Sequence, residues 1–502
     1  MRAALLRAST RSVNFPLRAL LPSTTHLSAS FPTTTTTRSL TNLSSSSTVV
    51  DNVRTAALNS ISNDDNFQQS SDLDRAFLDR AVRHCRLAGT SQEIGAIQEH
   101  VPGEEHVKDI NPFDLVAKDM RQLNGHIKEL LGSDHPVLET VAQYFFDVEG
   151  GKKIRPTMVL LMSRACNEDA MARGVVERGD GSDIAAAPSA KQIRLAEITE
   201  MIHTASLLHD DVIDTADSRR GVESVNSMFG NKLAVLAGDF LLARSSVCMA
   251  RLRNLDVIEL LATVIEHLVK GEVIQMKGVK SGSANAQIFD IYLRKNYYKT
   301  GSLMANSCKA ACLLNETGNN GLQYYQNNAN SSELAQQRAQ AAFVYGRGVG
   351  AAFQLVDDVL DFEASQLELG KPILNDLKQG LATAPVLFAQ QEYPALSEMI
   401  HRKFEHPGDI EKAHDLVMNR YEIFLNRFCC CFVVCFCCLC LPTSHWRCIV
   451  GPQMLHSDGL ERTKELAKEY SNQAVEAILQ LEQSDARDAL VNLARQITVR
   501  KM

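Results

Sequence analysis

The sequence contains two copies of the acidic pattern D-D-x-x-D, the first beginning at Asp210 and the second at Asp357. On a helix, residues four apart project from the same face, so Asp210 pairs with Asp214 and Asp357 pairs with Asp361. Each pair would place two negative charges side by side, and cations would have to neutralise them. A sparse set of carboxylate oxygens suits Mg²⁺, which keeps water and phosphate oxygens as its other ligands. The two patterns therefore predict a diphosphate held between facing clusters by Mg²⁺.

A single acidic cluster is as consistent with a solvated helix face as with a metal site. Here the clusters lie 147 positions apart (357 minus 210), and both are embedded in apolar residues. Leu207 and Leu208 precede the first cluster, and Phe353 and Leu355 precede the second. The apolar surroundings and the repetition favour the metal site. Its candidate catalytic carboxylates are Asp210, Asp211, Asp214, Asp357, Asp358 and Asp361.

Several basic residues could complete an anion site. Lys152 and Arg155 follow two glycines, which would let an anion approach the backbone, and Arg suits bidentate phosphate contacts. The further candidate cations are Arg219, Arg220, Lys299 and Lys371. Each of these alone would more often be a surface charge.

Apolar residues recur at helical spacing along the chain from about Pro112, as in Leu123, Ile127 and Leu130. No run shows the alternation typical of strands. The pattern predicts an all-α protein, a single large helical bundle over residues 112–502. Residues 51–111 are expected to form a linker and lead-in segment.

The first fifty residues contain no Asp or Glu, five Arg and twenty Ser or Thr. Basic residues spread among Ala, Leu and Phe without acids are typical of a mitochondrial transit peptide. A disordered tail and a plastid address are the alternatives. We expect the mature protein in the mitochondrion, in the matrix or on the matrix face of the inner membrane.

The net charge of −7 and the absence of long basic stripes argue against a nucleic-acid partner. Eight of the thirteen cysteines lie between Cys429 and Cys448. The remaining five are expected to be reduced thiols, as in a cytosol-like compartment such as the matrix. They are Cys85, Cys166, Cys248, Cys308 and Cys312.

The Cys-rich stretch around Phe428–Leu441 fits no standard structural role. It is shorter than the roughly 20 apolar residues of a membrane-spanning helix. Most of its thiols are crowded at adjacent or alternate positions, which differs from the separate, well-spaced Cys pairs of a typical zinc site. Because Phe, Cys and Val have T-rich codons, we interpret residues 421–456 as translated intron. A mature transcript that always carries the segment would contradict this.

Six stretches together resemble the trans-isoprenyl diphosphate synthase family, and within it the long-chain polyprenyl diphosphate synthases of ubiquinone biosynthesis. They are GGKKIRP, IHTASLLHDDVIDTADSRRG, NKLAVLAGDFLLARSS, YYKTGSLM, FQLVDDVLDF and GKPILNDLKQGLATAPV. As a set in this order they are highly specific. Lys153 departs from the usual Arg, and the Cys-rich insert has no counterpart in the family. The resemblance implies the isoprenoid synthase fold, a helical bundle around a deep apolar cavity.

The resemblance also implies roles for individual residues. Isopentenyl diphosphate would be held by Lys152, Arg155, His203 and Arg220. The allylic diphosphate, farnesyl or geranylgeranyl, would be held by Arg219, Lys299, Thr300, Gln354 and Lys371. The metal ligands would be Asp210, Asp214, Asp357, Asp358 and Asp361. Charge on the departing pyrophosphate would be stabilised by Mg²⁺ and the cations, and the pyrophosphate itself would take the final proton.

Product length is predicted from the residues below the first cluster. Ala205 and Ser206 lie about 7.5 and 6 Å deeper than Asp210 at 1.5 Å per residue. An aromatic side chain there would close the cavity, whereas these small ones leave it open. We therefore expect a long product.

Other activities and assemblies are also consistent with the sequence. A terpene cyclase shares the fold, but its second metal motif usually mixes Asn, Ser and Glu. A non-catalytic subunit of a heteromeric synthase, or a subunit disabled by the insert, is the second alternative. The resemblance further implies a homodimer or a heteromer with a related subunit, with peripheral association at the inner membrane.

Overall fold

The computed structural model describes residues 101–132, 136–147, 153–173, 187–219, 221–277, 285–315, 329–363, 374–418 and 457–500. The predicted transit peptide, most of the predicted linker and the whole Cys-rich insert lie outside these residues.

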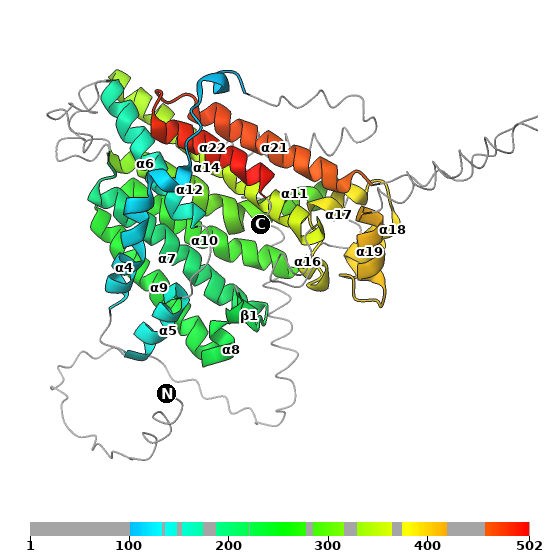
Figure 1. Ribbon diagram of the computed structural model, residues 1–502. Helices are drawn as coiled ribbons and strands as arrows, with labels where there is room; N and C mark the ends of the chain where they lie inside the picture. Colours follow the sequence, from blue (N-terminus) through cyan, green and yellow to red (C-terminus); the bar gives the residue numbers. More distant parts are fainter. Residues whose placement is uncertain are drawn as a thin grey trace, which may run out of the picture. The chain divides into compact units, whose positions relative to one another are not determined.

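The described residues are almost entirely helical, which confirms the predicted all-α class (Figure 1). The helices of the first half are η4 (Glu104–His106), α3 (Pro112–Leu115), α4 (Ala117–Leu131), α5 (Pro136–Asp147), α6 (Ile154–Ala172), α7 (Ala190–Ile213), α8 (Val225–Phe229), α9 (Asn231–Leu252) and α10 (Leu255–Lys277). Those of the second half are α11 (Asn285–Asn296), the π-helical segment η6 (Tyr297–Gly301), α12 (Ser302–Asn315), α14 (Ala329–Glu363), α16 (Asn375–Lys378), α17 (Ala384–Ala389), α18 (Ala395–His401), α19 (Asp409–Met418), α21 (Gly459–Ile478) and α22 (Asp485–Val499). One antiparallel hairpin joins β1 (Ser218–Arg219) to β2 (Val222–Glu223).

Helices α7, α12 and α14 carry the core of the bundle. Helix α12 packs against both α7 and α14, while α9 covers α7 and α21 covers α14. Close approach of α14 to α12 depends on glycine. A Cβ at Gly346 would lie 2.5 Å from the carbonyl oxygen of Met304, and one at Gly350 would lie 2.8 Å from the Cα of Gly301. Larger residues at these two positions would push α14 away from the start of α12 and from η6, which directly precedes it.

Local sequence signals set both ends of α7. Ser189 and Gln192 form a capping box, in which each side chain accepts from the other residue's backbone N–H. At the other end, Asp214 closes the last turn by donating its N–H to the carbonyl of Asp210 (2.8 Å). Thr215 then adopts a positive φ of 51°, and the chain turns into the β1–β2 hairpin. The first acidic cluster therefore lies at the C-terminal end of a long buried helix.

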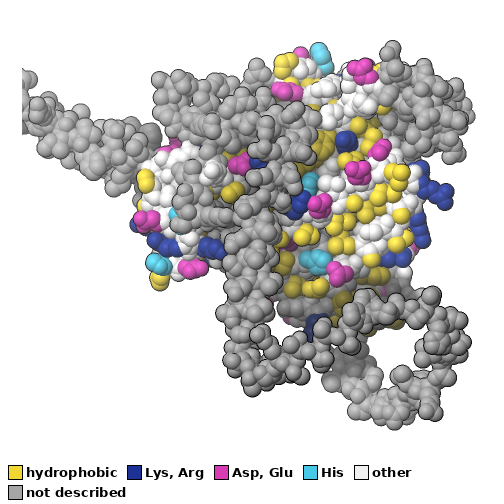
Figure 2. All heavy atoms as spheres, turned by 180° about the vertical axis from the view of Figure 1, so that it is seen from behind, with side chains coloured by type: hydrophobic (Ala, Val, Ile, Leu, Met, Phe, Trp, Pro, Cys, Tyr) yellow, Lys and Arg dark blue, Asp and Glu magenta, His cyan; other side chains and the backbone are white. Residues whose placement is uncertain are grey.

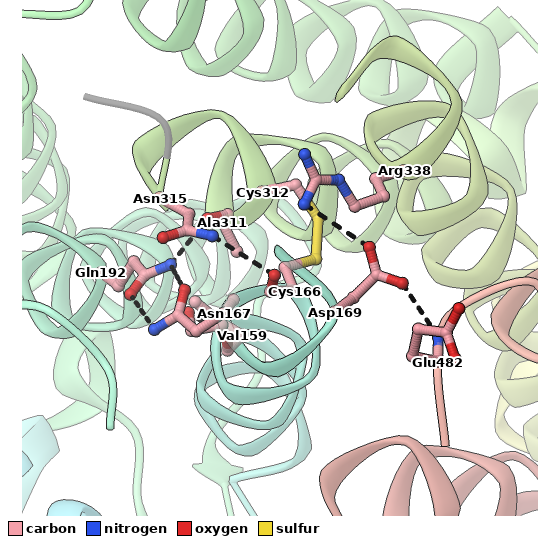
Figure 3. Close-up of a disulfide and its surroundings, with 11 residues drawn as sticks. Val159, Cys166, Asn167, Asp169, Gln192, Ala311, Cys312, Asn315, Arg338 and Glu482 are labelled. Atoms are coloured by element: carbon pink, nitrogen blue, oxygen red, sulfur yellow. Dashed lines mark hydrogen bonds and ion pairs between the residues drawn. A yellow bond between two sulfur atoms is a disulfide. The ribbon is translucent and has the colours of Figure 1, made fainter. Parts of the chain in front are cut away.

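A disulfide joins Cys166 of α6 to Cys312 of α12, with their Cα atoms 5.6 Å apart (Figure 3). The expectation of reduced thiols was wrong for this pair, because the two cysteines, 146 positions apart in sequence, meet only in the packed bundle. Cys248 and Cys308 are free, as expected, and Cys85 lies outside the described residues.

Buried hydrogen bonds surround the disulfide. The amide of Gln192 donates to Asn167 (3.0 Å) and to the carbonyl of Ala311 (2.9 Å), which ties α6, α7 and α12 together (Figure 3). Gln192 and Asp210 are 18 residues apart on α7 (210 minus 192), or about 27 Å along the helix. The end of α7 remote from the acidic cluster is therefore held by these side-chain bonds and the disulfide.

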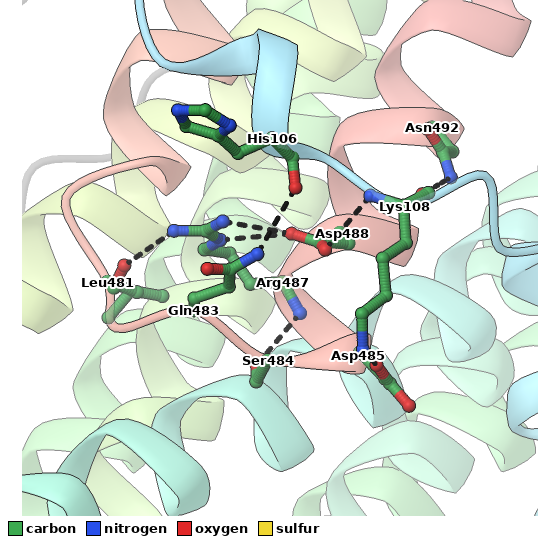
Figure 4. Close-up of polar contacts among 9 residues, drawn as sticks. All are labelled: His106, Lys108, Leu481, Gln483, Ser484, Asp485, Arg487, Asp488 and Asn492. Carbon is green, nitrogen blue, oxygen red and sulfur yellow. Dashed lines mark hydrogen bonds and ion pairs between the residues drawn. The ribbon is translucent and has the colours of Figure 1, made fainter.

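Residues 101–111 are attached to α22 by polar contacts (Figure 4). The backbone N–H of Lys108 donates to Asp488 (3.1 Å), and its ammonium pairs with Asp485 (2.7 Å). Asn492 donates to the carbonyls of Lys108 and Ile110. The C-terminal helix is thus joined to the segment that leads into the bundle.

Apolar side chains gather on part of the face shown in Figure 2. Among the described helices, α9 is long and apolar enough to cross a bilayer, with a mean hydropathy of 1.6 over its most apolar window. One side of α9 belongs to the core, through residues such as Leu241 and Met249. Exposed apolar residues on α8, α9 and α10 include Met228, Val235, Leu236, Val247, Leu255, Val269 and Met276. We therefore describe α9 as a bundle helix with an exposed apolar side.

Candidate active site

The first acidic cluster contacts a lysine from a different part of the chain. Asp210 Oδ2 lies 4.0 Å from Lys299 Nζ, and Lys299 also pairs with Glu272 of α10. The pKa of Asp210 is raised to about 7, mainly by burial; Lys299 opposes the rise, and the neighbouring Glu272 and Asp214 add to it. One ammonium is therefore shared among several acidic groups, and the cluster has excess negative charge.

The other two carboxylates of this cluster have different surroundings. Burial is also the main cause of the raised pKa of Asp214, which lies at the end of α7. Asp211 points into the protein and is only 2% exposed. The guanidinium of Arg219 binds it through three contacts of 2.6 to 2.9 Å. The β1–β2 hairpin thus returns Arg219 to the end of α7, where it neutralises the inward carboxylate.

Lys299 and Thr300 lie in η6, where the hydrogen bonds span five residues instead of four. The N–H of Ser302 donates to the carbonyl of Tyr297, which is the bond that defines a π-turn. Such turns are frequent at functional sites. Gly271 lets α10 approach this segment, because a Cβ there would lie 2.7 Å from Lys299 Cγ. The position of Lys299 is therefore set by close contact with α10.

The second cluster is well supplied with hydrogen-bond donors. Asp358 is 2% exposed and accepts from the hydroxyl of Tyr292, from the amide of Gln354 (3.1 Å) and from the backbone N–H of Ala384 (3.5 Å). Burial raises the pKa of Asp358, while these donors and the nearby Lys295 oppose the rise. The carboxylate at this position is held by its neighbours.

Asp361 and Asp357 are also in contact with donors. Asp361 accepts from the backbone N–H groups of Asn375 and Asp376 (3.1 and 3.2 Å), at the start of α16. Asp357, 42% exposed at its side chain, pairs with Arg500. The Arg500 guanidinium also lies over the ring of Phe353, 4.1 Å from its centroid. The chain terminus thus supplies a cation to the most exposed of the three positions.

Neighbouring residues of η6 contact the two clusters. Lys299 lies at Asp210, while the hydroxyl of Thr300 donates to the amide oxygen of Gln354 (3.2 Å), whose nitrogen bonds Asp358. Two helices from distant parts of the sequence are therefore brought to one short segment. This arrangement suits an anion that lies between the two clusters and is bound to the carboxylates of each through a cation.

The remaining predicted residues belong to α6 and α7 or lie outside the described residues. Arg155 of α6 and His203 of α7 are hydrogen-bonded (3.0 Å). Ala205 is fully buried, and Ser206 donates to the carbonyl of His203 (2.8 Å). Lys152, Arg220 and Lys371 lie outside the described residues.

The donor set fits a hard divalent cation. Its candidate ligands are carboxylate oxygens, and a cation would offset the cost of ionising the buried Asp210, whose pKa is raised. Among the described residues, no three His, Cys, Asp or Glu side chains form a ready metal cage. Mg²⁺ is usually held by one or two carboxylates with substrate phosphates and water, so such a cage is not required.

Sequence patterns missed four residues of the site. Glu272, Tyr292 and Lys295 lie in helices between the motifs, and Arg500 lies at the end of the chain. The only local signal was the position of Lys295, four residues before Lys299. The others become visible only when the helices are packed.

Comparison with known proteins gives close matches. The sequence model described as polyprenyl synthetase matches residues 135–417. The probable mitochondrial hexaprenyl pyrophosphate synthase of Neurospora crassa is 39% identical over 430 residues, covering 80% of this chain and 84% of that protein. The mitochondrial solanesyl-diphosphate synthase 1 of Oryza sativa subsp. japonica is 40% identical, covering 76% of this chain and 75% of that protein.

A solved structure gives the same result. The polyprenyl synthase of Caulobacter crescentus, complexed with calcium and isoprenyl diphosphate, superposes with a TM-score of 0.58 at 26% identity. The match covers 78% of this chain and 97% of the bacterial one. The bundle described above is therefore a known enzyme fold, in agreement with the fold expected from the sequence.

Proposed function

This chain belongs to the polyprenyl synthetase family and is a mitochondrial prenyltransferase of the long-chain polyprenyl diphosphate synthase type; from this premise we propose which substrates it uses and how. It adds isopentenyl diphosphate units head to tail to farnesyl or geranylgeranyl diphosphate. The long product supplies the side chain of ubiquinone. The metal it requires is Mg²⁺.

One observation carries the proposal. Lys299 and Thr300, adjacent in η6, contact Asp210 and Gln354, and so connect the two acidic clusters. A diphosphate bound at this dipeptide would have carboxylates on both sides. Metal ions between those carboxylates and the phosphate oxygens would offset the cost of ionising the buried Asp210.

Residues of this chain have distinct parts in the proposed reaction. Asp210 and Asp214 would hold metal at the first cluster, with Asp357, Asp358 and Asp361 at the second. Lys299, Thr300 and Gln354 bind and orient the allylic diphosphate, together with Arg219 and Lys371. Lys152, Arg155, His203 and Arg220 hold isopentenyl diphosphate.

The reaction begins with ionisation of the allylic C–O bond. The pyrophosphate leaves with the electron pair of that bond, and an allylic cation remains. Bound Mg²⁺ would supply charge neutralisation at that leaving group. Lys299 adds a fixed positive charge to the same end of the substrate, where it is needed in the transition state. The π-electrons of isopentenyl diphosphate then form the new C–C bond, and the released pyrophosphate takes the proton that leaves the resulting cation.

The product cavity is proposed to pass Ala205 and Ser206 on α7. Ala205 lies five residues before Asp210 on α7 and is fully buried; on this proposal a larger side chain there would narrow the product cavity. Ala205→Phe should shorten the product while the first condensation continues. Unchanged product length in this variant would contradict the proposed route.

The chain termini and the insert are assigned on sequence grounds. We propose that residues 1–50 are a mitochondrial transit peptide, that 51–111 are a linker and lead-in segment, and that 112–502 form the synthase domain. Residues 421–456 are proposed to be retained intron, absent from the mature protein in the matrix or at the inner membrane.

An assembly is also proposed, either a homodimer or a heteromer with a related subunit. The exposed apolar side chains of α8, α9 and α10 support it, because large contiguous apolar surfaces mark interfaces. Sedimentation of Leu236→Glu against wild type tests this. A wild type that is monomeric at micromolar concentration would contradict the proposal.

The function itself is tested by product analysis. Purified protein is incubated with farnesyl diphosphate, isopentenyl diphosphate and Mg²⁺, and the dephosphorylated products are separated by chromatography. A long polyprenol ladder is expected. The same assay on a form lacking residues 421–456 separates a disabling insert from a wrong assignment, since absence of product from both forms would overturn the proposed function.

A further inference from the structure

His267 of α10 makes contacts that point to a role at the π-turn. Its Nδ1 lies 2.7 Å from the hydroxyl of Ser302. Its ring also lies against Tyr298 and Tyr297, with centroids 4.6 and 5.9 Å apart. Tyr297 and Ser302 are the two residues joined by the five-residue hydrogen bond of η6. A single side chain therefore contacts both ends of the π-turn.

The π-turn is the part of this site that most needs such support. A π-turn is rare beside the α-helical alternative, in which the N–H of Ser302 would pair with Tyr298. That change would rotate the residues before Ser302 about the helix axis by the angle of one residue, roughly 100°. Lys299 and Thr300 lie within the turn, so their directions toward Asp210 and Gln354 depend on it.

The hydrogen bonds at Ser302 are compatible with a neutral His267. The amide of Asn306 donates to the hydroxyl oxygen of Ser302 (3.2 Å) and to its carbonyl (2.8 Å). The hydroxyl hydrogen is then available to donate to Nδ1 of His267, an arrangement that suits a neutral ring with Nδ1 unprotonated. Burial lowers the pKa of His267 to about 4, in agreement with a neutral ring. Ser302 is fully buried, so water cannot replace the imidazole there.

We propose that His267 is a positioning residue, whose bond to Ser302 and contacts with Tyr297 and Tyr298 hold the π-turn that directs Lys299 and Thr300 to the two acidic clusters. It acts through these residues and does not touch substrate. The inference rests on the proposed function only in that the anion bound there is a diphosphate.

The chain offers a matched control one turn along α12. Ser307 is also fully buried, and its hydroxyl bonds Thr199 of α7 (3.0 Å). Ser302→Ala and Ser307→Ala each remove one buried hydrogen bond between helices, so they should lower the melting temperature by similar amounts. Only the first touches the π-turn.

The test measures KM for the allylic diphosphate, kcat and melting temperature for His267→Leu, His267→Asn, Ser302→Ala and Ser307→Ala. We expect His267→Leu and Ser302→Ala to raise KM by about tenfold or more, the range for a lost charge-assisted hydrogen bond to the diphosphate. Asn can place a polar atom near the position of Nδ1, so His267→Asn should recover most of the affinity. The double variant His267→Leu/Ser302→Ala should be no worse than either single one.

Binding of pyrophosphate with Mg²⁺, followed by calorimetry, repeats the comparison without turnover. A larger Kd for Ser302→Ala than for Ser307→Ala supports the inference about His267 even if wild type makes no polyprenol. The lack of polyprenol would instead overturn the proposed function. Equal effects of the two serine variants on both KM and Kd would overturn the inference about His267. So would a His267→Leu variant that is folded and has wild-type KM and Kd.

Discussion

The two D-D-x-x-D clusters have the same spacing but different surroundings. In the second, Asp358 accepts three hydrogen bonds, Asp361 accepts hydrogen bonds from two backbone N–H groups, and Asp357 pairs with Arg500. In the first, Arg219 neutralises Asp211, but Asp210 has Lys299 at 4.0 Å and shares it with Glu272. All three carboxylates of the second cluster thus contact protein donors, whereas Asp210 in the first has only a shared ammonium.

This difference separates two uses of one motif. A carboxylate with raised pKa and little compensation gains most from a metal ion. A carboxylate held by several donors is already fixed in place, and contributes geometry as well as charge. We expect substitutions in the first cluster to affect metal binding most, and substitutions in the second cluster to affect the free energy of unfolding most.

The largest expected effect is on turnover. Asp210→Asn should lower kcat/KM about 10³-fold or more, because it removes a proposed metal ligand and a negative charge beside the leaving group. Asp290→Asn is the matched control, since Asp290 lies in α11 and pairs with Arg294 one turn away. Steady-state rates at saturating Mg²⁺ test this, and an Asp210→Asn variant within tenfold of wild type would remove the basis of the comparison.

Next in size is a pH effect on the metal-free protein. Because folding raises the pKa of Asp210 from 3.8 to about 7, its ionisation costs stability as pH rises through this window. Asp210→Asn should therefore match wild type near pH 4 and exceed it by about 4 kcal/mol at pH 8, at 1.36 kcal/mol per pKa unit. Urea unfolding in chelator measures the difference. A constant gap at all pH values would show that burial of the charge is not the cause.

A smaller effect should appear in the second cluster. Asp358→Ala leaves the buried hydroxyl of Tyr292 and the amide of Gln354 without their acceptor, and should cost about 2–3 kcal/mol of unfolding free energy. Asp357→Ala, at a more exposed pair, should cost under about 1 kcal/mol. Urea denaturation of both at pH 7 tests the ranking, and equal losses would refute it.

The smallest effect concerns the cation at the chain terminus. Arg500→Gln should strengthen Mg²⁺ binding in the presence of pyrophosphate by about fivefold, because a competing charge worth roughly 1 kcal/mol leaves Asp357. Arg495→Gln is the control, since Arg495 on α22 pairs with Glu104 instead. Calorimetric titration measures both, and weaker binding by Arg500→Gln would indicate that the arginine assists metal binding.

Much of this arrangement could be read from short-range patterns. Helical spacing of apolar residues predicted the all-α bundle, and the motifs predicted one site for Asp210, Lys299 and Asp357, of which Asp210 and Lys299 lie in contact in the structure. The pairing of Cys166 with Cys312 could not be predicted, because the two residues meet only through packing of α6 against α12. Nor could the partners Glu272 and Arg500 be found, since nothing near them in sequence indicates the acidic clusters.

By itself, the sequence determined the chemical groups, their helical faces and the family, because these follow from residue types at short spacing. Only the tertiary structure decided how those groups differ. The π-turn of η6, the sharing of Lys299 and the donors around Asp358 depend on contacts between residues tens to hundreds of positions apart. Burial and charge at each carboxylate are sums over such contacts, so identical motifs acquire different properties once the helices pack.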